Sequence, residues 1–329
     1  RASFYVLGPL VSRYGYAKVS MPGGCAWGPR PVDLHLKGLE KLGAEISLES
    51  GYVIAKAERL IGNRFHFDVS SVGATGNLLM AAALAKGTTL LTNAATEPEI
   101  TALARFLVKM GAKIDGIGTP QLEIEGVDTL HPADEITIPD RIETATYLIA
   151  AAITGGKLEL ENTNPYHLTA VIAKLEEAGC EIDVNADKIS IEMNGKPKPV
   201  DITATIYPGF PTDVQSQWTA LMLAAEGTSK ITDNIYPDRF KHVPELIRLG
   251  ANVEVVDNSA IVIGGRKLSG ATVMASDLRA GASLVLAALI AEGTTEVLRV
   301  YHIDRGYENF EQRLQSIGAN IKRVKTDLI

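Results

Sequence analysis

An internal repeat constrains the fold of this chain more than any other feature of its sequence. A helix-to-strand junction of the form Leu-x-x-x-Gly-Ala occurs five times, with its glycine at Gly43, Gly111, Gly179, Gly250 and Gly318. Successive glycines are separated by 68, 68, 71 and 68 residues. A second series has spacings of 72, 69, 71 and 66 residues and consists of Gly15, Gly87, Gly156, Gly227 and Gly293. Two interlocked series with one period indicate that a single supersecondary unit is written five times.

Each repeat predicts the same elements in the same order. An Ala/Leu-rich helix, predicted at residues 76–86, 143–154, 215–226 and 279–292, ends at a glycine suited to a left-handed C-cap. A short strand follows, and then an amphipathic helix such as the one around Ile100, Ala104 and Leu107. Two further strands complete a β-α-β-α-β-β unit, which places the chain in the α/β class. The first helix is apolar nearly all round and is expected to be buried, with the second outside.

The length of the repeat bears on how the units assemble. Solenoid units are usually shorter than ~50 residues, so a period near 69 residues favours compact subdomains over an open solenoid, which is the alternative. The stretch 130–139 is polar and lacks the repeat signature. We therefore predict a domain boundary there, with one domain at residues 1–138 and a second at 139–329.

Composition excludes several functional classes. The 329 residues carry 32 basic and 39 acidic side chains, a formal charge of −7, which disfavours a nucleic-acid partner bound through a basic surface. The uncharged apolar run at 280–291 has twelve residues, short of the ~18 that a membrane helix needs. Two cysteines exclude a disulfide framework and suit a reducing compartment. These features predict a soluble cytoplasmic protein without a nucleic-acid or membrane partner.

The two cysteines differ in their setting. Cys180 occupies the repeat position that alanine fills in the other units, which predicts a packed small side chain. Cys25 lies in a Gly/Pro-rich loop with Arg30 close behind it. A nearby cation and partial exposure lower a thiol pKa and make it reactive. The loop alone leaves a reactive and an inert Cys25 equally open.

Arginines gather at the predicted starts of the helices. Acidic residues there are explained by capping and by the helix dipole, whereas the dipole disfavours a cation at an N-terminus. Five arginines nevertheless stand at such positions: Arg30, Arg141, Arg239, Arg279 and Arg305. Some of them are expected to pair with neighbouring acids. The others predict a polyanionic ligand held between guanidinium groups and free backbone N–H groups.

Several common catalytic motifs do not occur in the sequence. There is no Gly-x-x-x-x-Gly-Lys-Ser/Thr loop, no Gly-x-Gly-x-x-Gly after a strand, no His-Glu-x-x-His pair and no Gly-x-Ser-x-Gly elbow. These absences disfavour a nucleotide triphosphatase, a dehydrogenase, a metalloenzyme and a serine hydrolase. We therefore predict no metal site and no cofactor.

At this point the residues resemble a known family. The segment from Pro22 to His35, which includes Gly23-Gly24-Cys25 and Arg30-Pro31-Val32-Asp33, looks like the active-site loop of the UDP-N-acetylglucosamine 1-carboxyvinyltransferases. Further matching motifs follow in the family's order along the whole chain: Ser71-Val72-Gly73, Glu97-Pro98-Glu99, Asp140-Arg141-Ile142-Glu143, Pro211-Thr212-Asp213, Arg239-Phe240, Asp277-Leu278-Arg279 and Asp304-Arg305-Gly306-Tyr307.

The resemblance implies an architecture. Members of this family have six β-α-β-α-β-β units in two inside-out α/β domains that face a cleft, and the buried helices point their N-termini into it. Residues 1–138 then form the domain that carries the catalytic loop. Six units of about 69 residues require roughly 410 residues, which implies some 80 to 90 residues before Arg1. The family's Lys-Asn pair at phosphoenolpyruvate has no match in this chain.

The resemblance also implies a reaction and its participants. Family members transfer the enolpyruvyl group of phosphoenolpyruvate to the 3-hydroxyl of UDP-N-acetylglucosamine, the first committed step of peptidoglycan synthesis. Cys25 matches the general acid, Asp213 the base and Asp277 a further active-site acid. Arg30 and Arg305 match the phosphate-contacting arginines, and Arg239 and Arg279 match those at the carboxylate.

The UDP-sugar is expected to contact a second set of matching residues: Arg1, Arg30, Pro31, Val32, Asp33, Leu34, Ser71, Val72, Asp213 and Ile235. Where some relatives carry a basic residue just before the Ser-Val pair, this chain has Val69-Ser70, so one diphosphate contact is expected to be missing. Two alternatives remain: a catalytically idle UDP-sugar-binding paralogue and a transferase acting on shikimate 3-phosphate. The Gly-Gly-Cys loop disfavours the latter.

Overall fold

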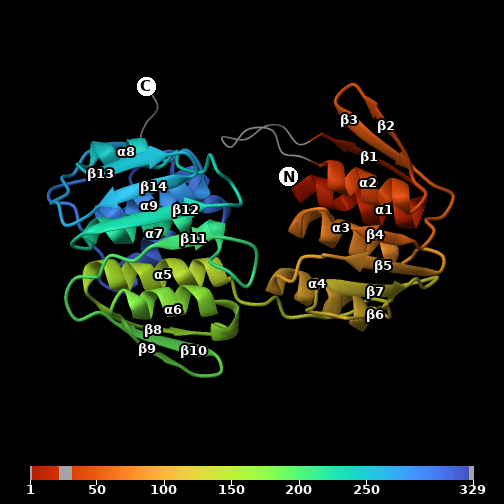
Figure 1. The fold of residues 1–329 in the computed structure, drawn as a ribbon, viewed down its shortest axis with the longest axis horizontal. Helices are drawn as coiled ribbons and strands as arrows, with labels where there is room; N and C mark the ends of the chain where they lie inside the picture. The colour runs from red at the N-terminus through yellow and green to blue at the C-terminus, as the bar shows by residue number, and fades with distance from the viewer. Residues whose placement is uncertain (1, 22–31, 326–329) are drawn as a thin grey trace. The chain divides into compact units, whose positions relative to one another are not determined.

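The computed structural model describes residues 2–21 and 32–325, and the chain divides into two compact units, Arg1–Ile138 and Pro139–Ile329 (Figure 1). Each unit has its own hydrophobic core. Within each of them, helices alternate with short strands, which confirms the α/β class.

The first unit holds two copies of the repeat. The first copy has an antiparallel sheet of order β1-β3-β2 and comprises η1 (Ala2–Val6), α1 (Leu7–Tyr14), β1 (Tyr16–Ser20), α2 (Asp33–Lys41), β2 (Glu45–Glu49) and β3 (Tyr52–Lys56). The second copy has a sheet of order β4-β5-β7-β6 and comprises β4 (Arg64–His66), α3 (Val72–Ala82), β5 (Thr88–Thr92), α4 (Pro98–Lys109), β6 (Lys113–Asp115) and β7 (Gln121–Glu125). The predicted β-α-β-α-β-β order is complete in this second copy.

The second unit begins with two further copies. The first contains α5 (Arg141–Thr154), β8 (Lys157–Glu161), η2 (Pro165–His167), α6 (Thr169–Glu177), β9 (Glu181–Val184) and β10 (Lys188–Glu192). The next repeats the complete order, with β11 (Ile202–Ala204), η3 (Thr212–Val214), α7 (Gln215–Ala224), β12 (Thr228–Asp233), α8 (Val243–Arg248), β13 (Asn252–Val256) and β14 (Ser259–Ile263). Its sheet order, β11-β12-β14-β13, matches that of the complete copy in the first unit.

The last copy is shorter than the sequence predicts. It contains β15 (Thr272–Met274), α9 (Leu278–Ala288), β16 (Glu296–Leu298), η4 (Val300–Arg305) and α10 (Phe310–Ser316). The strand expected at 294–297 begins two residues later, and no strand follows Gly318 within the described residues up to 325. The parallel pair β15-β16 is therefore the whole of this sheet as described.

The Leu-x-x-x-Gly-Ala junction is the same helix-ending motif in all five copies. Its glycine lies one residue beyond the C-cap with a φ between +91° and +102°. The next residue donates its backbone N–H to the leucine carbonyl five residues back, at 2.9–3.2 Å, as in Ala44 to Leu39 and Ala112 to Leu107. This is the Schellman pattern, in which glycine adopts the left-handed conformation without the cost of a Cβ. Each leucine is buried, so the motif joins the helix end to the core.

The second glycine series is only partly explained by helix capping. Gly15 caps α1 with φ +71°, as predicted, whereas α5 is capped by Gly155 and not by Gly156. The other buried helices end at Ala83, Ala225 and Leu289, several residues before the predicted glycines. Gly87, Gly227 and Gly293 instead adopt positive φ in the turn that leads into the next strand. These glycines were thus predicted for the right reason, φ > 0, but in the wrong element.

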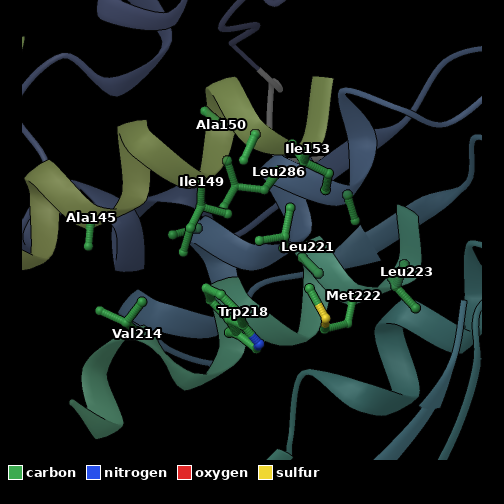
Figure 2. Close-up of a cluster of buried hydrophobic side chains, with 14 of the residues drawn as sticks. Ala145, Ile149, Ala150, Ile153, Val214, Trp218, Leu221, Met222, Leu223 and Leu286 are labelled. Atoms are coloured by element: carbon green, nitrogen blue, oxygen red, sulfur yellow. The ribbon is translucent and has the colours of Figure 1, made fainter. Parts of the chain in front are cut away.

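The buried helices form the centre of the second unit. Helices α5, α7 and α9 contact one another, and nearly all residues of α7 are buried. Figure 2 shows their side chains filling the space between them, among them Ile149, Ile153, Trp218, Leu221 and Leu286. Because these helices are apolar all round, sheets and outer helices can cover every side of them. The prediction that the first helix of each repeat is buried is confirmed for α3, α5, α7 and α9, whereas α1 buries only Leu7, Gly8 and Val11. Helices α4, α6, α8 and α10 bury only one face.

Two equivalent glycines make close backbone contacts that tie one copy to the next. Gly62 and Gly270 each follow an isolated parallel bridge, Ile61 to Lys86 and Ser269 to Glu292. A Cβ on Gly270 would lie 2.3–2.7 Å from the backbone O, C and N of Thr294, and a Cβ on Gly62 would meet Thr88 in the same way. No side-chain rotation can relieve such a contact.

We therefore expect Gly270→Ala to lower the free energy of unfolding by about 2–3 kcal/mol, since overpacking against rigid atoms forces the backbone apart. Urea unfolding would measure the loss. Gly156→Ala is the matched control, because its nearest contact is 3.4 Å from a side-chain oxygen and its φ is not in the left-handed region. Equal stability of the two variants would show that the contact at Thr294 is easily relaxed.

Candidate active site

The predicted site residues fall into three groups. Arg1, Cys25, Arg30 and Pro31 lie outside the described residues. The first unit carries Val32, Asp33, Leu34, Ser71 and Val72 at the starts of α2 and α3. The second unit carries Asp213, Ile235, Arg239, Asp277, Arg279 and Arg305, on loops and helix starts between residues 212 and 305.

In the first unit, the starts of α2 and α3 lie side by side. A Cβ on Gly73, in the first turn of α3, would lie 3.1 Å from Nε2 of His35, in the first turn of α2. Ser71 caps α3 by accepting the backbone N–H of Ala74 at 3.3 Å. Asp33 is exposed and pairs with Lys37 at 3.5 Å. The predicted UDP-sugar residues Val32–Leu34 and Ser71–Val72 are thus brought to one place on this unit.

A buried polar network, which the sequence analysis did not predict, holds these two helix starts together. Nδ2 of Asn77, on α3, lies 3.0 Å from Nδ1 of His35 and donates to the carbonyl of Phe4 at 3.2 Å. The side-chain oxygen of Asn77, Oδ1, accepts the backbone N–H of Gly8 at 2.7 Å. Asn77 is fully buried, so each of these bonds satisfies a group that would otherwise be costly to desolvate. The network links α1, α2 and α3.

The second unit brings two predicted arginines onto one predicted carboxylate. Arg239 Nη2 donates to Asp213 Oδ1 at 2.5 Å, and Arg279 Nε lies 3.6 Å from the same oxygen. Both guanidinium side chains are largely buried, with 10% and 13% exposed, whereas the Asp213 side chain is 42% exposed. Asp213 is thus the member of this cluster that is most exposed to solvent.

Thr212 and Asp233 hold the guanidinium of Arg239 in place through hydrogen bonds. Its Nη1 donates to Thr212 Oγ1 at 2.9 Å, and Thr212 donates to Asp233 Oδ2 at 2.6 Å. The other carboxylate oxygen of Asp233 accepts the backbone N–H of Ile235 at 2.9 Å. Asp233 is the last residue of β12 and is fully buried. Its carboxylate binds the backbone of Ile235 directly and Arg239 through the Thr212 hydroxyl.

The electrostatics of this cluster keep Asp213 ionised. Burial alone would raise the pKa of its carboxyl group, but the positive charges of Arg239 and Arg279 outweigh this effect and hold the pKa well below its usual range. The cluster of these three side chains has two positive charges and one negative charge. These three side chains thus carry a net positive charge in a chain that is acidic overall.

Four of the five arginines predicted at helix N-termini lie within the described residues. Two of them are at the start of a helix and two are not. Arg141 is the first residue of α5, whose cap is Asp140, and Arg279 is the second residue of α9, whose cap is Asp277. Arg239 precedes α8 by four residues, and Arg305 ends η4 five residues before α10. The prediction that these last two stand at helix starts was wrong, because turns separate them from the helices.

Asp277 forms hydrogen bonds at the start of α9, whereas Arg305 is exposed to solvent. Asp277 Oδ1 accepts the backbone N–H groups of Arg279 and Ala280 at 2.9 and 3.1 Å, and its Oδ2 accepts the Ser276 hydroxyl. Both oxygens thus serve the start of α9. Arg305 is exposed, and its neighbour Asp304 pairs instead with Arg323.

Comparison with known proteins assigns the chain to a family. A family profile described as EPSP synthase (3-phosphoshikimate 1-carboxyvinyltransferase) matches residues 1–314. The UDP-N-acetylglucosamine 1-carboxyvinyltransferase of Chlorobium chlorochromatii is 59% identical over 327 residues, which cover 99% of this chain and 77% of that protein. The enzyme of the same name from Koribacter versatilis is 57% identical over 98% of this chain and 75% of its own length. The chain belongs to the UDP-N-acetylglucosamine 1-carboxyvinyltransferase family.

Solved structures agree with membership of this carboxyvinyltransferase family. The enolpyruvyl transferase NikO from Streptomyces tendae matches with a TM-score of 0.87 and 29% identity over 97% of this chain and 76% of that chain. EPSP synthase from Acinetobacter baumannii shares the fold, with a TM-score of 0.71 and 21% identity over 96% of this chain and 77% of that one. The predicted enolpyruvyl transferase fold is confirmed, and the chain is an enzyme of the transferase class.

Two further observations concern the described residues only. None of the helices there combines the length and the apolar character that crossing a bilayer requires. Cys180 is buried, as predicted from its alanine-like position, and burial raises the pKa of its thiol to about 11. A thiol with such a pKa stays protonated near neutral pH and is a poor nucleophile.

His242 is a buried histidine in the same cluster of loops, three residues after Arg239. It is 1% exposed, and neither ring nitrogen has a hydrogen-bond partner among the described residues. Burial, together with the charge of Arg239, lowers the pKa of His242 to about 3. At pH values between the unfolded-state pKa near 6.5 and the folded-state pKa of about 3, His242 is protonated in the unfolded chain and neutral in the folded chain. Stability must therefore fall as the pH drops through this window.

We expect the wild type to lose about 1.6 kcal/mol more stability than His242→Leu between pH 6.5 and pH 5, because the loss per pH unit rises from about 0.7 kcal/mol at pH 6.5 toward about 1.4 kcal/mol at lower pH. Urea unfolding can be followed through the fluorescence of Trp218, which is buried in this unit, in a background where the only other tryptophan is changed by Trp27→Phe. Parallel pH dependences of the two proteins would contradict the assignment of this proton to His242.

Proposed function

We propose that this chain transfers the enolpyruvyl group of phosphoenolpyruvate to the 3-hydroxyl of UDP-N-acetylglucosamine and releases phosphate. The observation that carries the proposal is the cluster in which Arg239 and Arg279 share the carboxylate of Asp213. Two buried guanidinium groups suit a substrate carboxylate, and an ionised carboxylate beside them suits the removal of a hydroxyl proton. Relatives at 56–59% identity bear the name of this activity.

The reaction has an addition step and an elimination step, and we assign particular residues a role in each step. In the addition, the 3-hydroxyl oxygen bonds to C2 of phosphoenolpyruvate, Asp213 takes the hydroxyl proton, and Cys25 delivers a proton to C3. In the elimination, the C2–O bond to phosphate breaks, and loss of a proton from C3 restores the double bond. Arg30 and Arg305 neutralise the phosphate as it leaves. We assign the substrate carboxylate to Arg239 and Arg279.

The ion pairs of the free protein suggest how Asp213 becomes basic enough. A carboxylate with a strongly lowered pKa is a weak base, and here the two arginines cause the lowering. A substrate carboxylate that binds these arginines spreads their positive charge over two anions. The pKa of Asp213 then rises, because opposite charge stabilises it less and a like charge lies nearby. Binding of phosphoenolpyruvate would thus prepare the base for the second substrate.

The test is phosphate release from phosphoenolpyruvate by the purified full chain. Release with UDP-N-acetylglucosamine, and none with shikimate 3-phosphate or without an acceptor, is the expected result. Release with shikimate 3-phosphate alone would replace the proposed acceptor. No release with either acceptor from a folded protein would contradict the proposal and favour an idle UDP-sugar-binding protein.

The proposed substrates place the chain in a cellular setting. Both are small, water-soluble anions, and the reaction makes the first dedicated precursor of peptidoglycan. We propose that the chain acts in the cytoplasm on these small molecules and needs no metal or organic cofactor, because Asp213 supplies the base, Cys25 supplies the acid and the arginines supply the positive charge.

A further inference from the structure

Tyr307 lies next to the cluster formed by Asp213, Arg239 and Arg279, here called the arginine cluster, and is joined to it by hydrogen bonds. It follows η4 by two residues, its side chain is buried, and its hydroxyl lies 3.4 Å from Nη1 of Arg279. We propose that Tyr307 is a positioning residue that fixes the guanidinium of Arg279 for the substrate carboxylate. The proposal rests on the proposed function, because it concerns the group that Arg279 would hold.

The hydrogen bonds around Tyr307 have a fixed direction. The Thr146 hydroxyl donates its single proton to the carbonyl of Ile142, one turn earlier in α5, at 2.8 Å. Thr146 must therefore accept the bond that joins it to the Tyr307 hydroxyl, also at 2.8 Å. The Tyr307 hydroxyl therefore donates its proton to Thr146, and its oxygen can still accept a hydrogen bond from Arg279 Nη1. This direction leaves Tyr307 an acceptor toward a cation, which is the favourable sense.

The same network reaches the backbone of both site residues. Gln217 Nε2 donates to the carbonyl of Asp213 at 3.0 Å and lies 3.4 Å from the Tyr307 hydroxyl. Ser216 Oγ lies 2.8 Å from Gln217 Oε1 and 3.0 Å from the carbonyl of Arg279. All four polar side chains of the network are at most 3% exposed. The starts of α7 and α9 are thus held at a set distance by groups that cannot exchange partners with water.

Arg279 contacts Tyr307 as well as Asp213. Its Nε is 3.6 Å from the Asp213 carboxylate, too long for a good hydrogen bond, whereas Arg239 holds that oxygen at 2.5 Å. The guanidinium carbon of Arg279 lies 5.9 Å from the centre of the Tyr307 ring, within the range of a cation–π contact. The phenol therefore offers both an acceptor and a ring face to the guanidinium of Arg279, in addition to its ion pair with Asp213.

The test is steady-state kinetics of Tyr307→Phe with both substrates. Phenylalanine keeps the ring and removes only the acceptor. We expect the KM for phosphoenolpyruvate to rise about tenfold, as for loss of one hydrogen bond to a charged group, and the KM for UDP-N-acetylglucosamine to stay within twofold. Thr146→Val, which removes the acceptor for the Tyr307 proton, should shift the first KM in the same direction. Thermal melting checks that both variants fold.

Tyr147→Phe is the matched control. The rings of Tyr147 and Tyr307 both contact Phe310, with centroids 5.9 and 4.7 Å away, and Tyr147 is also buried. Its hydroxyl has no hydrogen-bond partner among the described residues, so this variant should keep both KM values. Equal changes in both KM values of Tyr307→Phe, or kinetics like those of Tyr147→Phe, would overturn the positioning role while the proposed function stands. A wild type that does not turn over would overturn both.

Discussion

Asp213→Asn will reduce kcat by about 10³-fold, within the range by which general bases accelerate reactions. The amide cannot accept the hydroxyl proton, although it keeps the size of the side chain and can still accept a hydrogen bond from Arg239. The variant also leaves Arg239 and Arg279 without their shared carboxylate, which strengthens the site for other anions. We therefore expect the KM for phosphoenolpyruvate to stay equal or fall while kcat collapses. Phosphate release under saturating substrates measures the effect.

The control for Asp213→Asn must change the same charge elsewhere in the second unit. Glu308→Gln does so at an exposed position, where the carboxylate pairs with Arg313 at 3.0 Å. Its turnover should equal that of the wild type, since surface ion pairs contribute little. A normal rate for Asp213→Asn would remove this residue from the chemistry and leave it as an ion-pair partner of the two arginines.

Arg239→Lys will lower kcat/KM for phosphoenolpyruvate by about 10²-fold. The guanidinium donates to Thr212 and Asp213 through different nitrogens and, in the proposed complex, must also contact a substrate carboxylate. A lysine ammonium keeps the charge but lacks the planar fork, so it cannot make these contacts together. About 3 kcal/mol is lost if two charge-assisted bonds are weakened, which corresponds to the expected factor.

A second arginine tests whether this effect is specific. Arg248 donates through two nitrogens to the carbonyl of Thr272, at 3.1 and 2.9 Å, on the exposed side of the same unit. Arg248→Lys makes the same chemical change away from the cluster and should leave kcat/KM unchanged. A similar loss in both variants would indicate a general effect on the unit and not a role for Arg239 in substrate binding.

The repeat made most of the fold predictable from the sequence. Residues that recur with one period report local geometry, and the five leucine-glycine junctions predicted five helix ends because a left-handed residue after a helix strongly favours glycine. The helix starts were less predictable. Arg239 and Arg305 were placed at N-termini because the sequence cannot distinguish a turn that precedes a helix from the helix itself when both contain Asp and Arg.

Three charged residues of the candidate site that the sequence singled out lie together in the structure, whereas the neutral residues that hold them were not predicted. Asp213, Arg239 and Arg279 belong to motifs that match the family, and the structure places them together. Tyr307 and Thr146 are 161 positions apart, and Asn77 and His35 are 42 apart. Their contacts depend on how whole helices pack, which no local pattern reports. A buried polar residue inside an apolar helix, such as Gln217 in α7, was the one signal that could have indicated them.

The unequal charge balance of the arginine cluster has a consequence for how the protein is handled. Two guanidinium groups that face one carboxylate attract any small anion, whether it is a substrate or a buffer component. Phosphate and sulfate would compete with phosphoenolpyruvate directly, and even chloride would weaken its attraction by screening, since the Debye length falls to about 8 Å at physiological ionic strength. Titrations in weakly binding, low-salt buffers would therefore give tighter affinities than the same titrations in phosphate-buffered saline.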